Sequence, residues 1–478
     1  MNWKTIRAAF KNADMRKKIF VIAFLVVIFR ILTYIPVPFG DATEIRAAIE
    51  SAFANQRLFG FVDILSGGAL AGFSIMLMGI GPYINSSIIM QILTKVIPKL
   101  QELNKEGQSG RTKINQYTRY LTLPLAIAQS FGMIFLIRQV VQSSSGLDII
   151  ATASFVDWVV MITSLVAGSM LLMWIGELMS EQGVGNGISL IIFAGIVTQL
   201  PSIANILLPA FAPGADYIFK TDIPGISTGL GFEFTVPFNL TAIFIVLLFL
   251  VITLVVTYFV VKLNEAQRIV TISYAKRIRG NRAYGGVDTV LPIKLIIAGV
   301  IPIIFAVAFL SVPPFLGTLL QSASSEWLQN IGTNLQNWFA VGGGYFGGAS
   351  TSTDGSSNVI YPTLYFSLVV LFSYISAGLY FNPKEIAENL QKQGGFVAGI
   401  RPGEKTEKYL KGIVNRLTLF GSFALGFIAI LPFLAERFTG NQLLTVGGTG
   451  LLIVVSVAIE SLRQLESKAL MITYDAPE

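Results

Sequence analysis

Long apolar runs separated by short polar connections dominate the chain. Ten runs are each about 20 residues long, the length that an α-helix needs to cross the hydrocarbon core of a bilayer. They cover roughly residues 19–38, 74–97, 118–140, 156–179, 186–209, 240–262, 292–313, 359–381, 413–434 and 443–463. The pattern predicts an all-α polytopic membrane protein with ten transmembrane helices.

The ten predicted spans divide into two sets of five. Because five is an odd number, the first spans of the two sets enter the membrane from opposite sides. Gly79-Ile80-Gly81-Pro82 interrupts the second span of the first set, and Gly299-Val300-Ile301-Pro302 interrupts the second span of the second set. Matched interruptions indicate two inverted five-helix halves around a shared central site. Gly and Pro are common in membrane helices, so a chance match is the alternative.

Residues 62–74 form an unusual segment between the first two spans. They are too short and Gly-rich to cross a bilayer, yet too apolar for an ordinary aqueous loop. A short re-entrant helix fits, because irregular backbone at membrane depth must be buried in protein or line a cavity. An interfacial stretch leading into the second span fits as well.

Positive charge is distributed unevenly between the connections. Of the 34 Lys and Arg residues, 28 lie in the N-tail, in the segments 95–119, 262–294 and 384–416, and in the C-terminal part from Arg463 onward. Because Lys and Arg are enriched in cytoplasmic loops, we expect these segments and both termini to be cytoplasmic. The connection 314–358 has no Lys or Arg and is rich in Gly, Ser and Thr, which is typical of a mobile outer loop.

The composition limits the kinds of reaction and binding site that this chain can provide. Only 13% of the residues are charged and 53% are hydrophobic, which excludes a soluble globule. The chain has no Cys and no His, which excludes disulfides, thiolate nucleophiles, Cys/His metal sites and histidine-dependent acid–base catalysis. We therefore expect no enzyme activity, no catalytic residue, no metal and no cofactor. Arg30 and Glu460, the ionisable residues well inside the spans, are interpreted as structural.

Nine short motifs occur in a recognisable order along the ten spans. They are Asp63-Ile64-Leu65-Ser66-Gly67-Gly68-Ala69-Leu70 with Gly81-Pro82-Tyr83-Ile84, Lys105-Glu106-Gly107-Gln108-Ser109-Gly110-Arg111 with Tyr117-Thr118-Arg119-Tyr120, Gly183-Val184-Gly185-Asn186-Gly187-Ile188-Ser189, Tyr274-Ala275-Lys276-Arg277, Gly299-Val300-Ile301-Pro302, Gly399-Ile400-Arg401-Pro402-Gly403 and Val446-Gly447-Gly448-Thr449. In this order the chain resembles the SecY family, the channel subunits of the bacterial Sec protein translocase.

The resemblance implies an hourglass pore between the two halves, closed at its waist by aliphatic side chains and plugged from outside. The implied pore ring is Ile80, Ile84, Ile188, Ile192, Ile304 and Ile453. The implied plug is Asp63, Ile64, Leu65, Ser66, Gly67, Gly68, Ala69 and Leu70, and the implied polar residues of a lateral gate are Asn85 and Gln129. Independently of the resemblance, the first two ring pairs are four residues apart and share a helix face. Lipid contact or ordinary helix packing is the alternative for each isoleucine.

The two long basic connections are explained by cytoplasmic topology alone, but the resemblance also assigns them to partner docking. The implied docking residues are Arg268, Lys276, Arg277 and Arg401. The implied partners are the SecA motor ATPase, the ribosome, the small membrane subunits SecE and SecG, polypeptides that carry signal sequences, and membrane lipid. Clustered Lys and Arg attract a polyanion such as ribosomal RNA.

The resemblance thus predicts a central protein-conducting channel in the plasma membrane of a bacterium. It passes unfolded polypeptides across the membrane and releases hydrophobic segments sideways into it. A secondary transporter with inverted repeats is the alternative, although such a transporter needs charged or polar groups at its broken helices. The expected parts are an N-tail (1–18), a first half (19–209, with the plug at about 62–74), an outer connection (210–239), a second half (240–463, with cytoplasmic loops at about 263–292 and 382–412 and the outer loop 314–358) and a C-tail (464–478).

Overall fold

Helices account for most of the computed structural model. It describes residues 12–39, 69, 72–145, 154–198, 240–274, 277–279, 282–284, 288–297, 299, 301–321, 325–339, 360–439 and 443–475. The helices before residue 200 are α2 (Ala13–Leu32), α5 (Gly81–Val96), α6 (Pro98–Lys105), α7 (Gln108–Ser145), α8 (Phe155–Glu181) and α9 (Gly187–Val197). The later helices are α11 (Leu240–Glu265), α12 (Ile301–Gln321), α13 (Glu326–Phe339), α14 (Ile360–Tyr380), α15 (Pro383–Lys392), α16 (Glu404–Thr439) and α17 (Leu443–Asp475).

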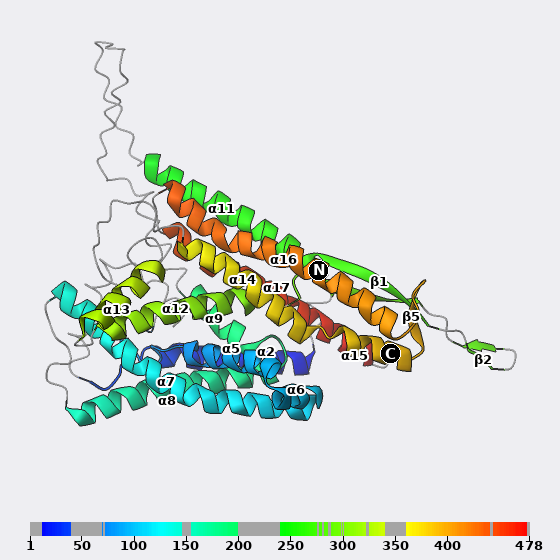
Figure 1. Ribbon diagram of the computed structural model, residues 1–478, viewed down its shortest axis with the longest axis horizontal. Helices are drawn as coiled ribbons and strands as arrows, with labels where there is room; N and C mark the ends of the chain where they lie inside the picture. Colours follow the sequence, from blue (N-terminus) through cyan, green and yellow to red (C-terminus); the bar gives the residue numbers. More distant parts are fainter. Residues whose placement is uncertain are drawn as a thin grey trace, which may run out of the picture.

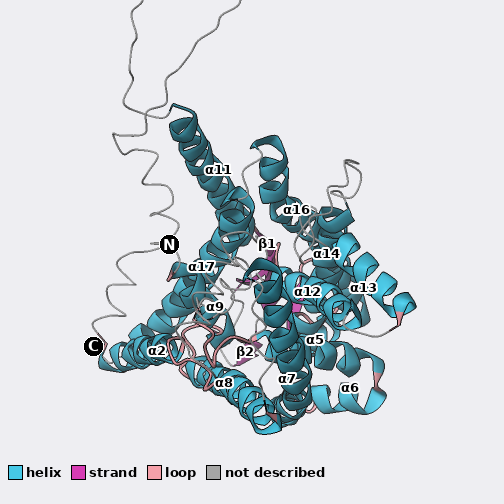
Figure 2. Cartoon of the chain, turned by 90° about the vertical axis from the view of Figure 1, so that its left-hand side faces the viewer, coloured by secondary structure: helices cyan, strands magenta, loops and turns pink. Residues whose placement is uncertain are grey.

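The helices form an elongated bundle with two sides. In both ribbon views α2, α7 and α8 lie on one side and α11, α14 and α16 on the other, with α9, α12 and α17 between them (Figures 1 and 2). The first side is built from the first half of the chain and the second side from the second half. This arrangement places the contact between the halves in the middle of the bundle.

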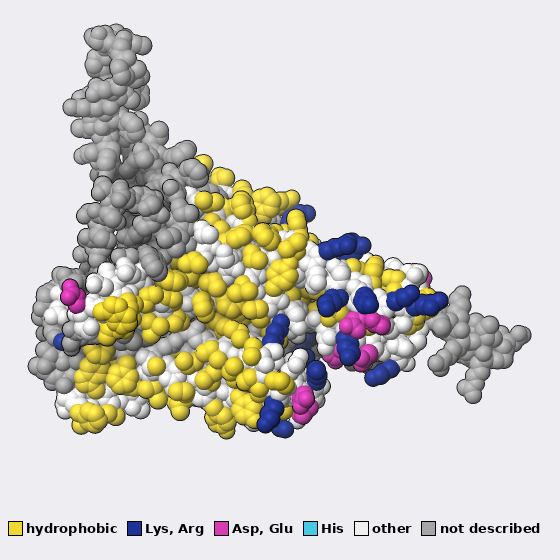
Figure 3. Space-filling model, viewed as in Figure 1, with side chains coloured by type: hydrophobic (Ala, Val, Ile, Leu, Met, Phe, Trp, Pro, Cys, Tyr) yellow, Lys and Arg dark blue, Asp and Glu magenta, His cyan; other side chains and the backbone are white. Residues whose placement is uncertain are grey.

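The surface divides into an apolar belt and a charged end. Hydrophobic side chains cover the middle of the bundle, whereas Lys, Arg, Asp and Glu gather at the end that carries α15 and the strand β1 (Gln267–Tyr274) (Figures 1 and 3). An apolar belt bounded by charge is the surface that a bilayer requires. The fold class is therefore that of a polytopic helical membrane protein.

The count of ten spans is not settled by the helices themselves. Among the described residues, three segments are long and apolar enough to cross a bilayer by length and composition alone: Phe155–Glu181, Tyr361–Lys392 and Glu404–Leu434. Two shorter apolar stretches are α9 (Gly187–Val197) and the first part of α12, Ile301–Leu310. The number ten stays a prediction.

A small sheet stands at the charged end, where only loops were expected. The strands β1, β4 (Asp288–Lys294) and β5 (Gly395–Val397) pair antiparallel in the order β4-β1-β5, and a separate hairpin pairs β2 (Arg277–Arg279) with β3 (Arg282–Tyr284). The seventh predicted span, 292–313, therefore begins too early, because its first residues complete β4 and helix α12 starts only at Ile301.

The outer connection 314–358 also differs from the expected mobile loop in its described part. Helix α12 continues to Gln321, and α13 packs against it. A Cβ built on Gly332 of α13 would lie 2.6 Å from the carbonyl oxygen of Gly317 in α12, so the two backbones touch where neither residue has a side chain. The small residues in this part permit close helix packing, whereas the Gly-, Ser- and Thr-rich part after residue 339 lies outside the described residues, where the mobile loop stays a prediction.

The described end of the 62–74 segment is tied to the end of α2. The Phe73 carbonyl accepts from the Val37 amide at 2.9 Å, and Ser74 forms a bridge with Pro36. The Ser74 hydroxyl donates to the Leu32 carbonyl at 3.1 Å. These contacts satisfy backbone groups beyond the C-terminal end of α2 and anchor the chain directly before α5.

Candidate functional site

The first part of the site is the start of α5. Gly79 has a φ of 54°, a conformation that glycine adopts at little cost, and α5 begins two residues later with Gly81 and Pro82. Proline fits there because the first helical amides have no intrahelical acceptor. Ile80 and Ile84 flank this start, and both are buried.

The start of α12 repeats this local design. Gly299 has a φ of 62°, and α12 begins two residues later with Ile301 and Pro302. Ile304 follows in the first turn and is buried. The interruptions that the Gly/Pro pattern predicts in both halves are thus present, each as a left-handed glycine followed by a new helix.

The third part is α9, which is held by a short turn after α8. The Asn186 side chain caps α9 by accepting from the Ile188 amide at 3.0 Å. The Ser180 hydroxyl accepts from the Gly187 amide at 2.9 Å and donates to the Gly176 carbonyl at 2.8 Å. This network fixes the direction in which α9 leaves α8, and with it the face that carries Ile188 and Ile192.

The fourth part is α17, which packs against α9 and α11. A Cβ built on Gly450 would lie 3.3 Å from the side chain of Ile196, so α17 approaches α9 closely one turn before Ile453. Ile453 is itself buried. Four helices from both halves therefore direct isoleucines into the interior of the bundle.

One hydrophobic cluster contains all six predicted ring residues. Five of them are buried members of it, and Ile188 packs against it. The same cluster includes the fully buried Ala69 from the predicted plug. Their arrangement as a closed ring stays a prediction, and the other predicted plug residues, Asp63, Ile64, Leu65, Ser66, Gly67, Gly68 and Leu70, lie outside the described residues.

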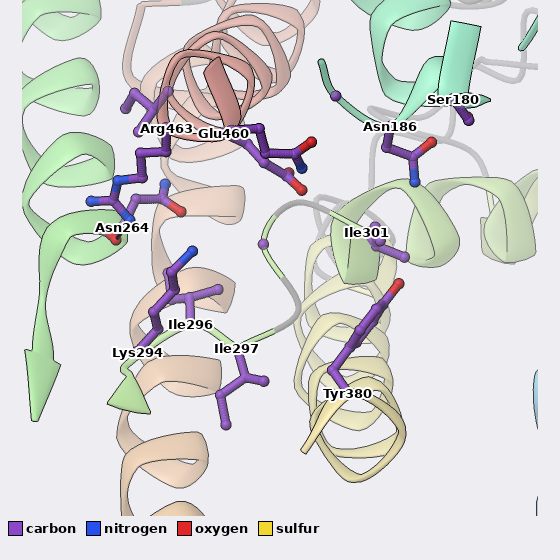
Figure 4. Close-up of a pocket in the computed structure, with 14 residues that line it drawn as sticks. Ser180, Asn186, Asn264, Lys294, Ile296, Ile297, Ile301, Tyr380, Glu460 and Arg463 are labelled. Atoms are coloured by element: carbon purple, nitrogen blue, oxygen red, sulfur yellow. Dashed lines mark hydrogen bonds between the residues drawn. The ribbon is translucent and has the colours of Figure 1, made fainter. Parts of the chain in front are cut away.

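A cavity of about 360 Å³, lined by both polar and apolar residues, lies next to this cluster. Residues of both halves line it, and Ile301, one turn before Ile304, belongs to its wall. Figure 4 shows the side chains of Lys294, Glu460 and Tyr380 extending toward a common space. The full lining is Ser180, Gly185, Asn186, Asn264, Lys294, Ile296, Ile297, Gly299, Ile301, Tyr380, Ile459, Glu460, Arg463 and Gln464.

Charged side chains of α17 hold the wall of this cavity. Arg463 donates through Nη1 to the Asn264 carbonyl at 2.7 Å, which gives a hydrogen-bond partner to a carbonyl at the C-terminal end of α11. The Asn264 amide group donates in turn to the Val260 carbonyl and to the Ser456 hydroxyl, at 3.0 and 3.3 Å. A Cβ built on Gly299 would lie 3.2 Å from Glu460 Oε2, so the carboxylate lies against the turn that starts α12.

Sequence reasoning missed most of this cavity. It interpreted Glu460 only as a structural residue inside the last span, and it did not single out Asn264, Lys294 or Tyr380. The available signal was Lys294, a charged residue within the predicted seventh span. Its position inside that span marked a wrong boundary, since Lys294 ends strand β4.

The predicted docking residues lie at the charged end of the molecule. Arg268 in β1 is exposed and pairs in register with Ile293 of β4, while Arg277 begins β2. Arg401 is exposed in the turn between β5 and α16, where its carbonyl accepts from the Thr406 hydroxyl at 2.9 Å. Lys276 lies outside the described residues. Because β5 pairs with β1, the two basic connections are parts of one surface.

The predicted gate residues lie on neighbouring helices of the first half. Asn85 of α5 and Gln129 of α7 are half-buried, and Gln129 Oε1 lies 4.0 Å from the position that a Cβ on Gly81 would take. Helix α12 of the second half packs against both α5 and α7. These three helices form a seam between the halves, which we call the α5/α12 seam.

Comparison with known proteins agrees with this architecture. The SecY family model matches residues 74–462. The protein translocase subunit SecY of Corynebacterium glutamicum is 39% identical over 478 residues, covering 98% of each chain, and the subunit of the same name from Mycobacterium tuberculosis is 36% identical at the same coverage.

Solved channel structures share the fold. A SecY structure from work on how the plug domain stabilises the closed translocation channel has a TM-score of 0.60 at 19% identity, covering 96% of this chain and 94% of that one. Sec61 in the canine ribosome-channel complex has a TM-score of 0.56 at 18% identity and the same coverage. With the family model and the closer relatives spanning nearly the whole sequence, the chain belongs to the SecY family, the membrane channel subunits of the protein translocase.

Proposed function

We propose that Ile80, Ile84, Ile188, Ile192, Ile304 and Ile453 form the constriction through which this channel passes unfolded polypeptides. The observation that carries the proposal is that one apolar cluster gathers all six from four helices of both halves. A constriction of branched apolar side chains holds neither water nor ions favourably, so it seals by dewetting. It also yields to a polypeptide of any sequence, because it makes no specific polar contact.

The cavity next to the cluster serves as the hydrated space on the cytoplasmic side of the constriction. Its carboxylate, ammonium, amide and phenol groups keep water in place up to Ile301, and the apolar residues begin one turn further on. Segment 62–74 closes the opposite side as a plug. The burial of Ala69 in the cluster, the bond from the Val37 amide to the Phe73 carbonyl and the bond from the Ser74 hydroxyl to the Leu32 carbonyl support that assignment.

Hydrophobic segments leave through the α5/α12 seam into the lipid. Asn85 and Gln129 line it as the polar residues of the lateral gate. The support is that α12 meets α5 and α7 directly and that α12 starts at a left-handed glycine, a point at which a helix can change direction at low cost.

Arg268, Lys276, Arg277 and Arg401 form the docking surface for the driving partner, the SecA motor or the ribosome. SecE and SecG complete the channel in the membrane. Both termini and the docking surface are cytoplasmic, and the two halves comprise residues 19–209 and 240–463. The gathering of charged side chains at the end of the bundle that carries β1 and α15 supports this topology (Figure 3).

A crosslinking experiment tests the constriction. A photoreactive amino acid is placed at Ile84, Ile192, Ile304 or Ile453 of the full chain in native membranes, and a secreted polypeptide is arrested during translocation. Crosslinks to the polypeptide are expected from all four positions. The control is Leu254 of α11, whose side chain is 61% exposed on the apolar belt and should crosslink to lipid. Crosslinks to lipid alone from the four isoleucines would reopen the transporter alternative.

A further inference from the structure

A hydrogen bond joins the two halves beside the seam. The Lys95 ammonium in the last turn of α5 donates to the Ile375 carbonyl of α14 at 2.9 Å. The partners are 280 residues apart in sequence and belong to opposite halves. On this side of the molecule α12 of the second half also packs against α5 and α7.

Gly378 makes room for this bond. A Cβ built on Gly378 would lie 3.0 Å from the Lys95 Nζ atom, closer than an ordinary contact. The absence of a side chain on α14 therefore lets the ammonium reach the backbone. The site is also favourable for a cation, because Ile375 lies near the C-terminal end of α14, where the helix dipole is negative.

Opening the seam must break this bond. When an apolar segment moves sideways out of the pore, α5 has to separate from the helices of the second half, and an ammonium cannot follow a carbonyl on a departing helix for more than a few ångströms. The free energy of the bond is then added to the cost of opening. A segment must offset that cost by the apolar surface that it buries in lipid.

We infer that Lys95 is a specificity-determining residue, which sets how hydrophobic a segment must be to leave the channel through the α5/α12 seam. This inference rests on the proposed lateral release. Lys95 makes no contact with the segment in this role. It acts by holding α14 against α5 until the segment opens the seam.

The test measures how a graded series of apolar segments divides between membrane insertion and full translocation. A secreted carrier protein with test segments of rising Leu content is expressed in cells in which each variant is the sole channel, and protease protection gives the inserted fraction. Lys95→Met keeps most of the side-chain stem and removes the donors. We expect it to raise the ratio of inserted to translocated carrier about three- to tenfold near the midpoint of the series.

Three further variants test whether the effect comes from the Lys95–Ile375 hydrogen bond or from the loss of a positive charge in general. Lys95→Arg retains a donor and should stay near the wild-type midpoint. Lys99→Met removes an exposed cation one turn further along the chain and should leave the midpoint unchanged. Gly378→Leu blocks the ammonium and should match Lys95→Met, and the double variant should go no further than either single change.

The outcomes distinguish this inference from the function on which it rests. If the wild-type channel inserts no test segment at any hydrophobicity, the lateral release itself is wrong. The role of Lys95 is overturned if the wild type inserts the segments but Lys95→Met leaves the midpoint in place or shifts it only as much as Lys99→Met does. It is also overturned if the midpoint shifts of Lys95→Met and Gly378→Leu add up in the double variant.

Discussion

Ile453 and Arg401 are the residues on which the proposed channel depends for opposite reasons. Ile453 is buried in the apolar cluster, and its proposed role there is to exclude water. Arg401 is exposed in a turn between two left-handed glycines, Gly399 with a φ of 80° and Gly403 with a φ of 95°. Its proposed role depends on this exposure, because a docking partner must contact its side chain. A change of polarity should therefore impair the seal at the first position and the partner contact at the second.

Replacing Ile453 by Asn should hydrate the constriction. We expect ion leak across vesicles that contain the variant to rise several-fold, and carriers with defective signal sequences to be exported more readily, because a polar side chain retains water where a branched apolar one repels it. Conductance of vesicles at rest measures the leak. Ile453→Leu, which nearly conserves volume and polarity, is the matched control and should keep the seal. An unchanged leak in Ile453→Asn would remove Ile453 from the ring.

Reversing the charge of Arg401 should weaken partner binding while the protein still folds and inserts. An exposed charge contributes little to stability, whereas charge reversal within a docking surface opposes like charges. We expect Arg401→Glu to lower the affinity for SecA or for ribosomes at least tenfold at low salt, as measured by co-sedimentation. Lys113→Glu makes the same change at an exposed position of α7 and should have a much smaller effect. Equal affinities for the two variants would contradict the assignment.

At the level of elements, glycines decide how closely the helices approach. Gly187 at the start of α9 lies against the backbone of Gly176 in α8, so that a Cβ at position 187 would collide with the Gly176 carbonyl oxygen. Gly412, inside α16, has no atom within 4 Å of the corresponding Cβ position. The same residue type is thus essential for packing in one helix and replaceable in another.

The pair Gly187→Ala and Gly412→Ala tests this difference. The first substitution forces α9 away from α8 and should destabilise the protein by about 2 kcal/mol or more, because backbone cannot move aside as a flexible side chain can. The second should be neutral or stabilising by up to about 1 kcal/mol, since Ala is the better helix former. Thermal unfolding in mild detergent gives both values, and a Gly187→Ala protein as stable as the wild type would refute the tight α8–α9 contact.

The helices and their breaks were predictable from sequence, whereas the sheet and α13 were not. Apolar runs and the Gly/Pro interruptions are local signals, and they gave the membrane class and the starts of α5 and α12. Strand β1 carried a signal of its own, since the buried Val270 and Ile272 alternate with the exposed Ile269 and Thr271. It went unnoticed because the surrounding charge explained the segment as a loop. The partner strand β5 lies more than 100 residues away, and no local pattern reports such pairing.

The candidate site was predictable only where a single helix face carries it. Four-residue spacing places Ile80 with Ile84, and Ile188 with Ile192, on one helix face. Ile304 and Ile453 were named only through the family resemblance, because no local pattern reports how four helices cross. The cavity was out of reach for the same reason, because its wall combines the end of β4, the turn at Gly299 and one face of α17. The Lys95 bond to Ile375 depends on a backbone atom, which has no sequence signature.

At the scale of the whole molecule, the proposed topology predicts which surfaces face the cytoplasm. The chain has no Cys of its own, so single cysteines report accessibility without background. Gln393→Cys, beside β5, should react with an impermeant maleimide only after the cytoplasmic face is exposed. Ser325→Cys, at the start of α13, should react in intact cells whose outer barrier is permeable to the reagent. Both residues are exposed. The reverse pattern of labelling would invert the topology, and labelling of both from one side would disprove it.

The pairing of β5 with β1 has a mechanical consequence. Every strand of the β4-β1-β5 sheet continues along the backbone into helices of the second half, directly or through α15. The described helices α2 to α9 have no strand in that sheet and pack against α12 and α17 of the second half. A force that a partner exerts on the sheet would therefore pass first to the helices of the second half, while the surrounding membrane resists movement of the first half. We expect such a force to shift the second half relative to the first along the packed contact between them, in the apolar middle of the bundle.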